Sequence, residues 1–211
     1  KEYRAEDEKE IAQAITWTAT QFDNIENVKV QIDGVAQDAM PVDGTVIGDD
    51  GLSRAVGINE KVGDAVDMTG TKAVTLYFPA KGQDDRYFVP VTQRVKADQG
   101  NIVAAVEGLF EGPSTDSGLS GIFDQNARLV SDPVIDDNGV TVNFNQAVWA
   151  DKEEETISNE ALNWLVLSLT TQEGIEKVAI QVDGEMKVRN EAGEMIAEPI
   201  SRPNDVNTVG L

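Results

Sequence analysis

The sequence repeats itself at an offset of 150 residues, and this repeat limits the architectures that the chain can adopt. Of the ten pairs formed by residues 25–34 and 175–184, six are identical. The same offset aligns Thr20 with Thr170, and Ser53-Arg54 matches Ser201-Arg202 after a gap of two residues. The chain therefore contains two copies of one domain type, in each of which a helix precedes a hairpin.

The two copies differ in the sequence that precedes the shared helix. Nearly 80 residues, from about Ala73, precede it in the second copy, and only about 7 precede it in the first. We expect residues 1–60 to be the carboxyl-terminal half of a truncated first domain, residues 61–72 a linker, and residues 73–211 a complete second domain. A half domain should expose an apolar face unless another segment covers it.

Composition excludes several classes of function. Lys and Arg total 17 against 38 Asp and Glu, and the net charge of −21 disfavours nucleic acids and anionic membranes as partners. The absence of His and Cys excludes Ser-His-Asp and Cys-His nucleophiles, disulfides, and zinc sites built from imidazole or thiolate. No apolar run approaches the roughly 20 residues that span a bilayer, so we expect any signal or lipid anchor to lie outside this sequence.

Periodicity predicts the order ββαββαββ in the second copy. The expected strands lie at residues 73–78, 86–95, 128–135, 140–145 and 177–182, and the expected helices at residues 101–110 and 153–171. The last strand should turn at Asp183-Gly184 into a short partner ending near Val188, and Glu153 to Glu155 should lie near the positive end of the second helix. In the first copy we expect a helix at residues 6–22 and a hairpin at residues 28–35. The predicted fold class is α+β, with helices packed on a mainly antiparallel sheet.

Two local signals refine this prediction. Pro90 lacks a donor N–H, which places its strand at a sheet edge or a bulge. Asn138-Gly139 is expected to supply the positive φ angles of the turn between the strands at 128–135 and 140–145.

Acidic clusters are the first candidates for a chemical site. Asp84/Asp85 and Asp136/Asp137 fall in predicted turns, so we interpret them as turn residues rather than as a paired general acid and base. Asp49-Asp50-Gly51 does not fit a calcium-binding loop, and the same holds for residues 136–139. Asp33-Gly34 and Asp183-Gly184 recur in both copies because a hairpin needs them.

The remaining candidates are a loop and three tryptophans. Residues 112–121 are rich in Gly, Ser and Thr but lack the lysine of a phosphate-binding loop, so they are interpreted as a connector, with partner contact as the alternative. Trp17 and Trp164 are predicted to pack in the core, and Trp149 to be the exposed aromatic residue. No catalytic, cofactor-binding or metal-binding residue is therefore assigned.

Several segments in order resemble the GerMN domain family of sporulation and spore germination proteins. They are residues 74–78, residues 87–92, Gly112-Pro113, residues 140–145, residues 17–22 and residues 199–203. The resemblance implies tandem domains similar to the small ring-building modules of secretion machines. It also implies a lipoprotein on the outer face of the mother-cell membrane, in the space between mother cell and forespore, where it assists assembly of the channel complex.

Three functional hypotheses follow. The first is a scaffold that binds other channel or envelope proteins, through the strand edge that carries Pro90 or through the loop at residues 112–121. The second is an envelope enzyme that acts on glycan through carboxylates, which the absence of His and Cys disfavours. The third is a module that binds peptidoglycan or a divalent cation. Neither the direct partner nor the oligomeric state follows from the sequence.

Overall fold

The computed structural model describes residues 3–22, 24–60, 71–81, 86–96, 98 and 100–203. The chain divides into two compact units, residues 1–60 (unit 1) and residues 61–211 (unit 2), each described separately below. Most of the predicted linker at residues 61–72 lies outside the described residues, so the three predicted domain boundaries stay a prediction.

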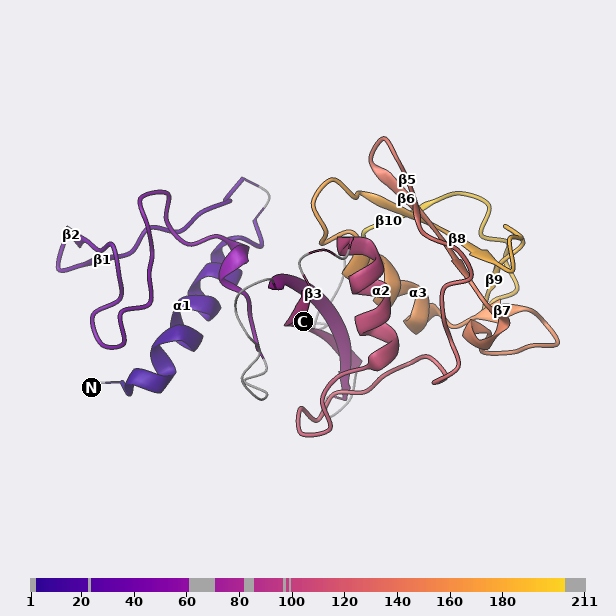
Figure 1. Cartoon of the computed structure of the whole chain (residues 1–211), viewed down its shortest axis with the longest axis horizontal. Coiled ribbons are helices and arrows are strands. Elements are labelled where there is room, and N and C mark those ends of the chain that lie inside the picture. Colours follow the sequence, from indigo (N-terminus) through magenta and orange to yellow (C-terminus); the bar gives the residue numbers. More distant parts are fainter. Residues whose placement is uncertain are drawn as a thin grey trace. The chain divides into compact units, whose positions relative to one another are not determined.

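Unit 1 is a helix packed against an irregular chain with one small hairpin (Figure 1). Its elements are α1 (Ala5–Ala19), β1 (Gln31–Ile32), β2 (Val35–Ala36) and the 3₁₀ helix η1 (Arg54–Val56). Its buried apolar cluster is small and comprises Ala12, Met40, Ile47 and Leu52. Trp17 is also buried, and it donates a hydrogen bond from Nε1 to the carbonyl of Gly57 at 2.9 Å.

Unit 2 contains two α-helices, a long hairpin and a four-stranded sheet. Its elements are β3 (Thr71–Lys81), β4 (Arg86–Lys96), α2 (Asn101–Glu111), β5 (Val134–Asp136), β6 (Gly139–Phe144), η2 (Gln146–Val148), β7 (Thr156–Ile157), α3 (Asn159–Leu169), β8 (Lys177–Val182), β9 (Arg189–Asn190) and β10 (Ile200–Ser201). The α+β class with mainly antiparallel pairing is confirmed, although β6 pairs with β8 in parallel and β7 pairs with β9 in parallel.

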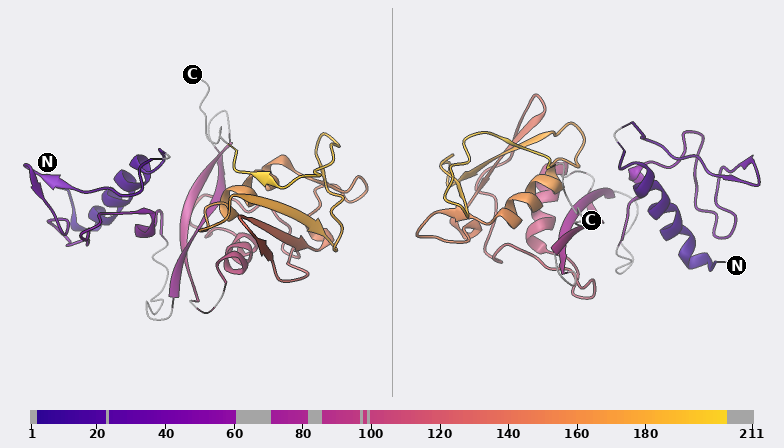
Figure 2. Two further views of the ribbon diagram at one scale, coloured as in Figure 1. Left: turned by 90° about the horizontal axis from the view of Figure 1, so that it is seen from above. Right: turned by 180° about the vertical axis from the view of Figure 1, so that it is seen from behind.

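The core of unit 2 lies around α3, between β3 and β8 (Figures 1 and 2). Inward-facing side chains of β6 and β8, among them Val142 and Val178, are fully buried. Phe123 stacks on Trp164 with ring centroids 5.2 Å apart, and Phe78 approaches the same indole at 5.7 Å. The predicted core positions of Trp17 and Trp164 are confirmed, whereas Trp149 is half-buried against the core rather than exposed.

The β3–β4 hairpin is a separate two-stranded sheet, because side chains of α3 and of the turn that follows it occupy the outer edge of β3. Ser168 Oγ accepts a hydrogen bond from the backbone N–H of Tyr77 at 3.0 Å, and Gln172 Nε2 donates one to the carbonyl of Thr75 at 3.1 Å. The backbone groups of Tyr77 therefore point away from β4. Since Tyr77 is opposite Pro90, the ring nitrogen of Pro90 also points away from the ladder, where a missing N–H costs no hydrogen bond within the hairpin.

Three predicted elements of unit 2 need correction. The helix predicted from residue 153 begins at Asn159, because Ser158 Oγ caps it by accepting a hydrogen bond from Ala161 N–H. Glu153 to Glu155 therefore lie in the preceding turn, where Asp151 Oδ1 accepts hydrogen bonds from the N–H groups of Glu153 and Glu154. The strand predicted after Asp183-Gly184 is also wrong, because the chain makes one bridge there and then buries Val188 in the core.

The strand predicted at residues 128–135 is interrupted near Pro133. Leu129 pairs with Phe144, but the pairing resumes at Val134 opposite Thr141, with the register shifted by two residues. The turn that follows is centred on Asp137 and Asn138, and Asp137 adopts the positive φ of 41°. Gly139 is a paired strand residue rather than the turn residue we predicted, and a Cβ there would lie 3.1 Å from Lys177 Cε.

The two copies share their local geometry. Val28 pairs with Leu52 in unit 1, as Val178 pairs with Ile200 in unit 2. Both Asp-Gly turns have nearly the same φ angles, 51° and 81° at Asp33-Gly34, and 50° and 82° at Asp183-Gly184. The sequence repeat is therefore a structural repeat as well.

An arginine closes each copy onto the carboxyl end of its helix. Arg202 Nη1 donates to the Leu167 carbonyl and to the hydroxyls of Thr170 and Thr171 at 3.0 to 3.1 Å, and Nη2 donates to Tyr77 Oη at 2.9 Å. Carbonyls in the last turn of a helix lack backbone partners within the helix and carry the negative end of its dipole. The guanidinium supplies a hydrogen-bond donor to such a carbonyl and a positive charge close to that end of the dipole.

The equivalent arginine of unit 1 makes a simpler contact. Arg54 donates hydrogen bonds to Thr20 Oγ1 and to the Thr20 carbonyl, both at 3.0 Å, and its guanidinium lies 4.7 Å from the centre of the Trp17 ring. The aromatic residue is supplied by the helix in unit 1 and by β3 in unit 2, where Arg202 lies over Tyr77. The repeated arginine thus binds the carboxyl end of the helix in both copies, although the residues around it differ.

Candidate functional site

The carboxylates singled out in the sequence lie in turns wherever the structure describes them. Asp136 and Asp137 begin the β5–β6 turn, and Asp50-Gly51 belongs to a turn in which Gly51 has a φ of 89° and donates to the Gly48 carbonyl. Asp84 and Asp85 lie outside the described residues. Within the described ranges, no group of three or more acidic side chains is placed to hold a metal ion.

The shifted carboxyl groups favour the charged form. Burial would raise the pKa of Glu8, but backbone N–H groups of Val42, Thr45 and Asp43 and the hydroxyl of Tyr3 donate to it, and together they lower that pKa. The backbone and side-chain N–H groups of Asn126 lower the pKa of Asp124 in the same way. A general acid needs the opposite shift, so these groups serve structure.

Glu8 is a structural residue that the sequence patterns did not single out. Its carboxylate is fully buried, and it holds the loop at residues 42–45 to the first turn of α1 through donor distances of 2.7 to 3.1 Å. In unit 2 the corresponding loop is held by Asn190, whose Oδ1 accepts from the N–H groups of Ala192 and Glu194. Because different residues fix the loop in the two copies, the repeat alignment gave no signal for Glu8.

The loop at residues 112–121 acts as a connector that seals a strand edge. Gly112, with a φ of 77°, ends α2. The Ser117 hydroxyl bonds within the loop, and Ser120 N–H donates to the Pro79 carbonyl on the outer edge of β3 at 3.1 Å. Contact of this loop with a partner stays a prediction.

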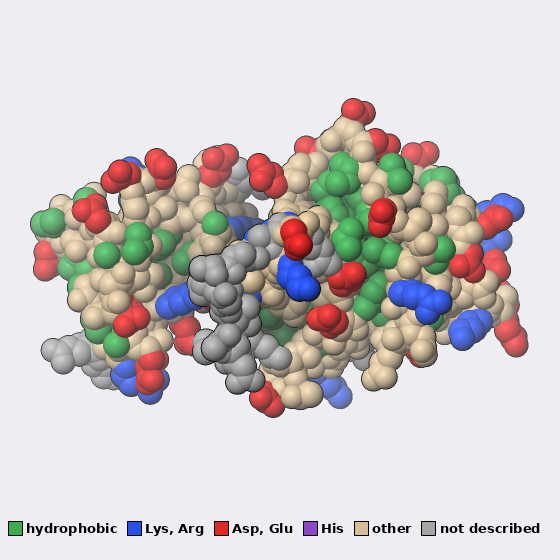
Figure 3. Space-filling view, viewed as in Figure 1, with side chains coloured by type: hydrophobic (Ala, Val, Ile, Leu, Met, Phe, Trp, Pro, Cys, Tyr) green, Lys and Arg blue, Asp and Glu red, His purple; other side chains and the backbone are tan. Residues whose placement is uncertain are grey.

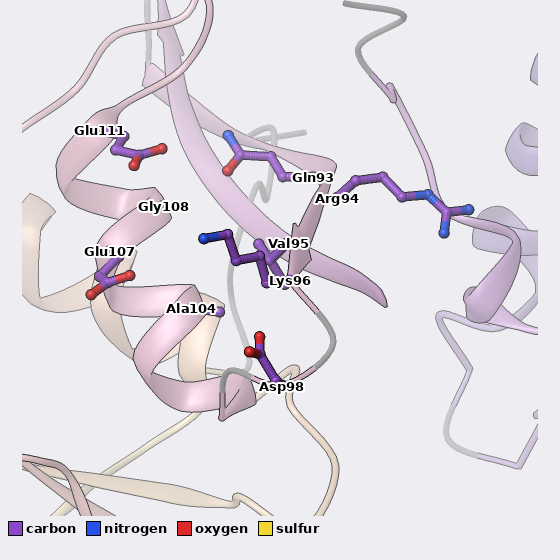
Figure 4. Close-up of a pocket in the computed structure, with 9 residues that line it drawn as sticks. All are labelled: Gln93, Arg94, Val95, Lys96, Asp98, Ala104, Glu107, Gly108 and Glu111. Carbon is purple, nitrogen blue, oxygen red and sulfur yellow. The ribbon is translucent and has the colours of Figure 1, made fainter. Parts of the chain in front are cut away.

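A polar groove of about 620 Å³ lies between β4 and α2 (Figure 4). Gln93 and Lys96 point toward α2, Arg94 points away from it, and Glu107 and Glu111 line the helix side. The groove is shaped by Gly108, since a Cβ at that position would lie 2.7 Å from Leu76 Cδ1. Such a mixture of one ammonium, one amide and several carboxylates suits a polar ligand with more than one charge.

Exposed apolar side chains gather on one face of unit 2, beside β5 and α2 (Figure 3). Val130, Val134 and Ile135 are 51%, 62% and 60% exposed, and all three lie within six residues of one another. The sequence assigned them to a strand but gave them no function. The available signal was Pro133 preceded by Asp132, because a proline and a charged residue in a strand mark a sheet edge.

Unit 1 also exposes apolar residues, and several of them align with buried residues of unit 2. Ile15 is 45% exposed, whereas Leu165 at the equivalent position is fully buried. Ile32 is exposed, whereas Val182 is buried. The expectation that residues 1–60 form half of a longer domain is consistent with these exposures but stays a prediction.

No helix in the described part of the chain is both long enough and apolar enough to cross a membrane.

The family model described as "Germane: Sporulation and spore germination" matches residues 1–38 and 75–188. A curated relative, the spore germination protein GerM of Bacillus subtilis (strain 168), is 44% identical over 211 residues, which is 99% of this chain and 57% of the relative. The chain thus spans somewhat more than half the length of that relative.

A solved structure gives the same likeness at the level of the fold. The tandem GerMN domains of the sporulation protein GerM from Bacillus subtilis superpose with a TM-score of 0.89 at 43% sequence identity. The superposition covers 98% of this chain and 72% of that chain. The tandem repeat read from the sequence therefore has a counterpart in a known structure.

Proposed function

Since the chain belongs to the Germane family of sporulation and spore germination, we propose that it is a non-catalytic scaffold that acts outside the cytoplasm by binding other proteins. A sporulation-related role follows from the 44% identity to a spore germination protein over nearly the whole chain, and this identity carries the proposal. In detail, we propose that the protein helps to assemble or localise the channel complex between mother cell and forespore, and that its domains resemble ring-building modules. A lipid anchor elsewhere in a longer protein would hold it at the mother-cell membrane.

The chemistry of the described surface supports binding rather than catalysis. Without His or Cys, an enzyme would depend on carboxylates, Lys, Tyr or hydroxyl groups. The carboxyls with shifted pKa values, Asp7, Glu8 and Asp124, are held in the charged form by local hydrogen bonds. The exposed apolar residues of unit 2 are typical of a surface that contacts another protein.

Deletion of the gene tests the role directly. Heat-resistant spores are counted after starvation, with vegetative growth measured alongside and a strain complemented by the intact gene as control. Fewer spores with normal growth, restored by the intact gene, support the proposal. Unchanged spore counts in the deletion strain would overturn it.

A second candidate function is a module that binds peptidoglycan or a divalent cation, and the polar groove favours its peptidoglycan form, since no acidic cluster in the described residues is placed to hold a metal ion. Its carboxylates and Lys96 are suited to the charged stem peptide of peptidoglycan. A rise in melting temperature with purified peptidoglycan fragments, or with calcium chloride, would support this function. If Glu107→Gln does not reduce that rise, the groove is not the binding site.

A further inference from the structure

The edge of β5 presents an open position for one more strand. Asp136 and Gly139 flank a two-residue turn, so their N–H and C=O groups pair with each other. Hydrogen-bonded and non-hydrogen-bonded pairs alternate along an antiparallel ladder. The next pair, Ile135 and Val140, is therefore a non-hydrogen-bonded pair, and the backbone groups of Ile135 point away from β6.

Contacts on β6 confirm this orientation independently. The Asn143 carbonyl accepts from Val130 N–H at 2.8 Å, so odd-numbered residues of β6 direct their backbone groups toward β5. The Phe144 carbonyl accepts from Asp183 N–H at 2.8 Å, on the side of β8. Among the residues that the structure describes, none donates to or accepts from the outward backbone groups of Ile135.

The outer edge of β3 shows how the same fold closes an edge. Gln172 donates to the Thr75 carbonyl, and Ser120 N–H donates to the Pro79 carbonyl. Ser168 Oγ accepts from the N–H of Tyr77. β5 has no such cover in the described part of unit 2, and its three residues are all exposed. An uncovered apolar edge is normally a liability that proteins block.

Charge identifies the kind of strand that fits this edge. Asp132, Asp136 and Asp137 surround the apolar residues of β5, and there is no Lys or Arg from Leu129 to Asp151. On β8, which pairs with β6, the side chain of Lys177 reaches Gly139, where Asp136 Oδ1 also lies, so one cation stands beside one of the three carboxylates. Two copies of β5 placed edge to edge would bring their aspartates together, which disfavours a second copy as the occupant.

We propose that β5 binds an extended segment of a partner protein in which apolar residues alternate with lysine or arginine, and that this segment adds a fifth strand to the sheet β10-β8-β6-β5. The outward N–H and C=O of Ile135 and the carbonyl of Pro133 supply the backbone hydrogen bonds. Val130 and Val134 contact the apolar side chains, and the three aspartates attract the cations. The proposal rests on the proposed function, because it takes the chain to act by binding protein.

The probe is an acetylated and amidated eight-residue peptide that alternates lysine and valine, added to the whole chain. Amide hydrogen exchange should show new protection at Ile135, and a peptide with glutamate in place of each lysine should give none. If the lysine peptide leaves the exchange of the Ile135 amide unchanged, the proposal is wrong.

Two matched variants separate edge pairing from attraction to the overall charge. Val134→Lys and Val46→Lys each add one positive charge at an exposed valine, the second of them in unit 1. Val134→Lys should weaken peptide binding about tenfold and Val46→Lys less than about twofold. Equal losses would overturn the proposal in favour of non-specific charge attraction.

A third variant tests the backbone bond itself. Ile135→Pro removes only an N–H that points away from β6, so the hairpin should fold, with unchanged circular dichroism, but should lose peptide binding. Undiminished binding by a folded Ile135→Pro protein would overturn the strand-addition geometry. If the peptide fails to bind while gene deletion still reduces spore counts, the proposed function stands and this inference falls.

Discussion

Units 1 and 2 contain the same helix, Asp-Gly turn and closing arginine, but in the described residues only unit 2 surrounds them with the hairpins β3–β4 and β5–β6, helix α2 and the short pair β7–β9. Leu165 and Val182 are buried in unit 2, while Ile15 and Ile32 at equivalent positions are exposed in unit 1. Local geometry, including the φ angles of both Asp-Gly turns, is nearly identical. Local structure is therefore encoded within the repeat, whereas burial depends on what packs against it.

The largest contrast should come from truncating one equivalent side chain in each unit. Leu165→Ala removes a fully buried side chain and should lower the free energy of unfolding of unit 2 by about 3 kcal/mol. Ile15→Ala, at a position that is 45% exposed, should cost unit 1 less than about 1 kcal/mol. Urea unfolding, with amide exchange to follow each unit, measures both. Equal losses would mean that Ile15 is buried in solution.

The closing arginines should differ by a smaller amount. Arg202→Lys removes hydrogen bonds to the Leu167 carbonyl, two threonine hydroxyls and Tyr77 Oη, and should destabilise unit 2 by about 2 kcal/mol. Arg54→Lys removes bonds to Thr20 alone and should cost unit 1 about 1 kcal/mol. Thermal unfolding of the two variants provides the comparison. A larger cost at Arg54 would contradict the assignment of the more extensive contact to unit 2.

The two hairpin turns should respond alike. Gly34→Ala and Gly184→Ala place a side chain at φ angles of 81° and 82°, where no other atom lies within 4 Å of the new Cβ. The cost is therefore that of the left-handed backbone alone, about 1 kcal/mol in each unit. Gly121→Ala, where φ is not positive and the nearest atom would lie 4.0 Å from the new Cβ, serves as the control and should cost less. Unequal costs at the two turns would show that their surroundings differ in solution.

The contribution of Glu8 to the stability of unit 1 should be insensitive to pH near neutrality and should be lost in acid. The pKa of Glu8 is lowered on folding, so its contribution to stability is present above the ordinary value of 4.5 and is lost as the pH falls through the folded value. Amide exchange at Val42, Asp43 and Thr45 should therefore accelerate as the pH falls below that ordinary value. Glu8→Gln should remove this pH dependence, and a variant that retains it would assign the effect to another carboxyl.

Much of the fold could be predicted because the deciding interactions are local. Gly112 ends α2, the Asp-Gly turns form as expected, and strands 140–145 and 177–182 differ from β6 and β8 by one residue at most. The parallel pairing of β6 with β8 and the separation of β3 and β4 from the main sheet were not foreseen. Both depend on contacts distant in sequence, such as Tyr77 with Ser168, which carry no periodic signal.

The candidate binding surface was less predictable than the fold. Sequence reasoning proposed the strand of Pro90 and the loop at residues 112–121, but Ser120 of that loop is bonded to β3. The exposure of Val134 and Ile135 depends on which strand ends the sheet, and alternation alone does not give strand order. Only the interruption at Pro133 pointed to an edge.

The closing arginines have a consequence for the order of events during synthesis. Arg202 lies 33 residues after Leu169, the last residue of α3, so the ribosome makes the helix well before the side chain that caps its final carbonyls. Each copy thus receives its finishing contact from one of the last residues translated within it. Strands β6 and β8 also precede Arg202 in the sequence, so this contact is among the last in unit 2 that synthesis permits.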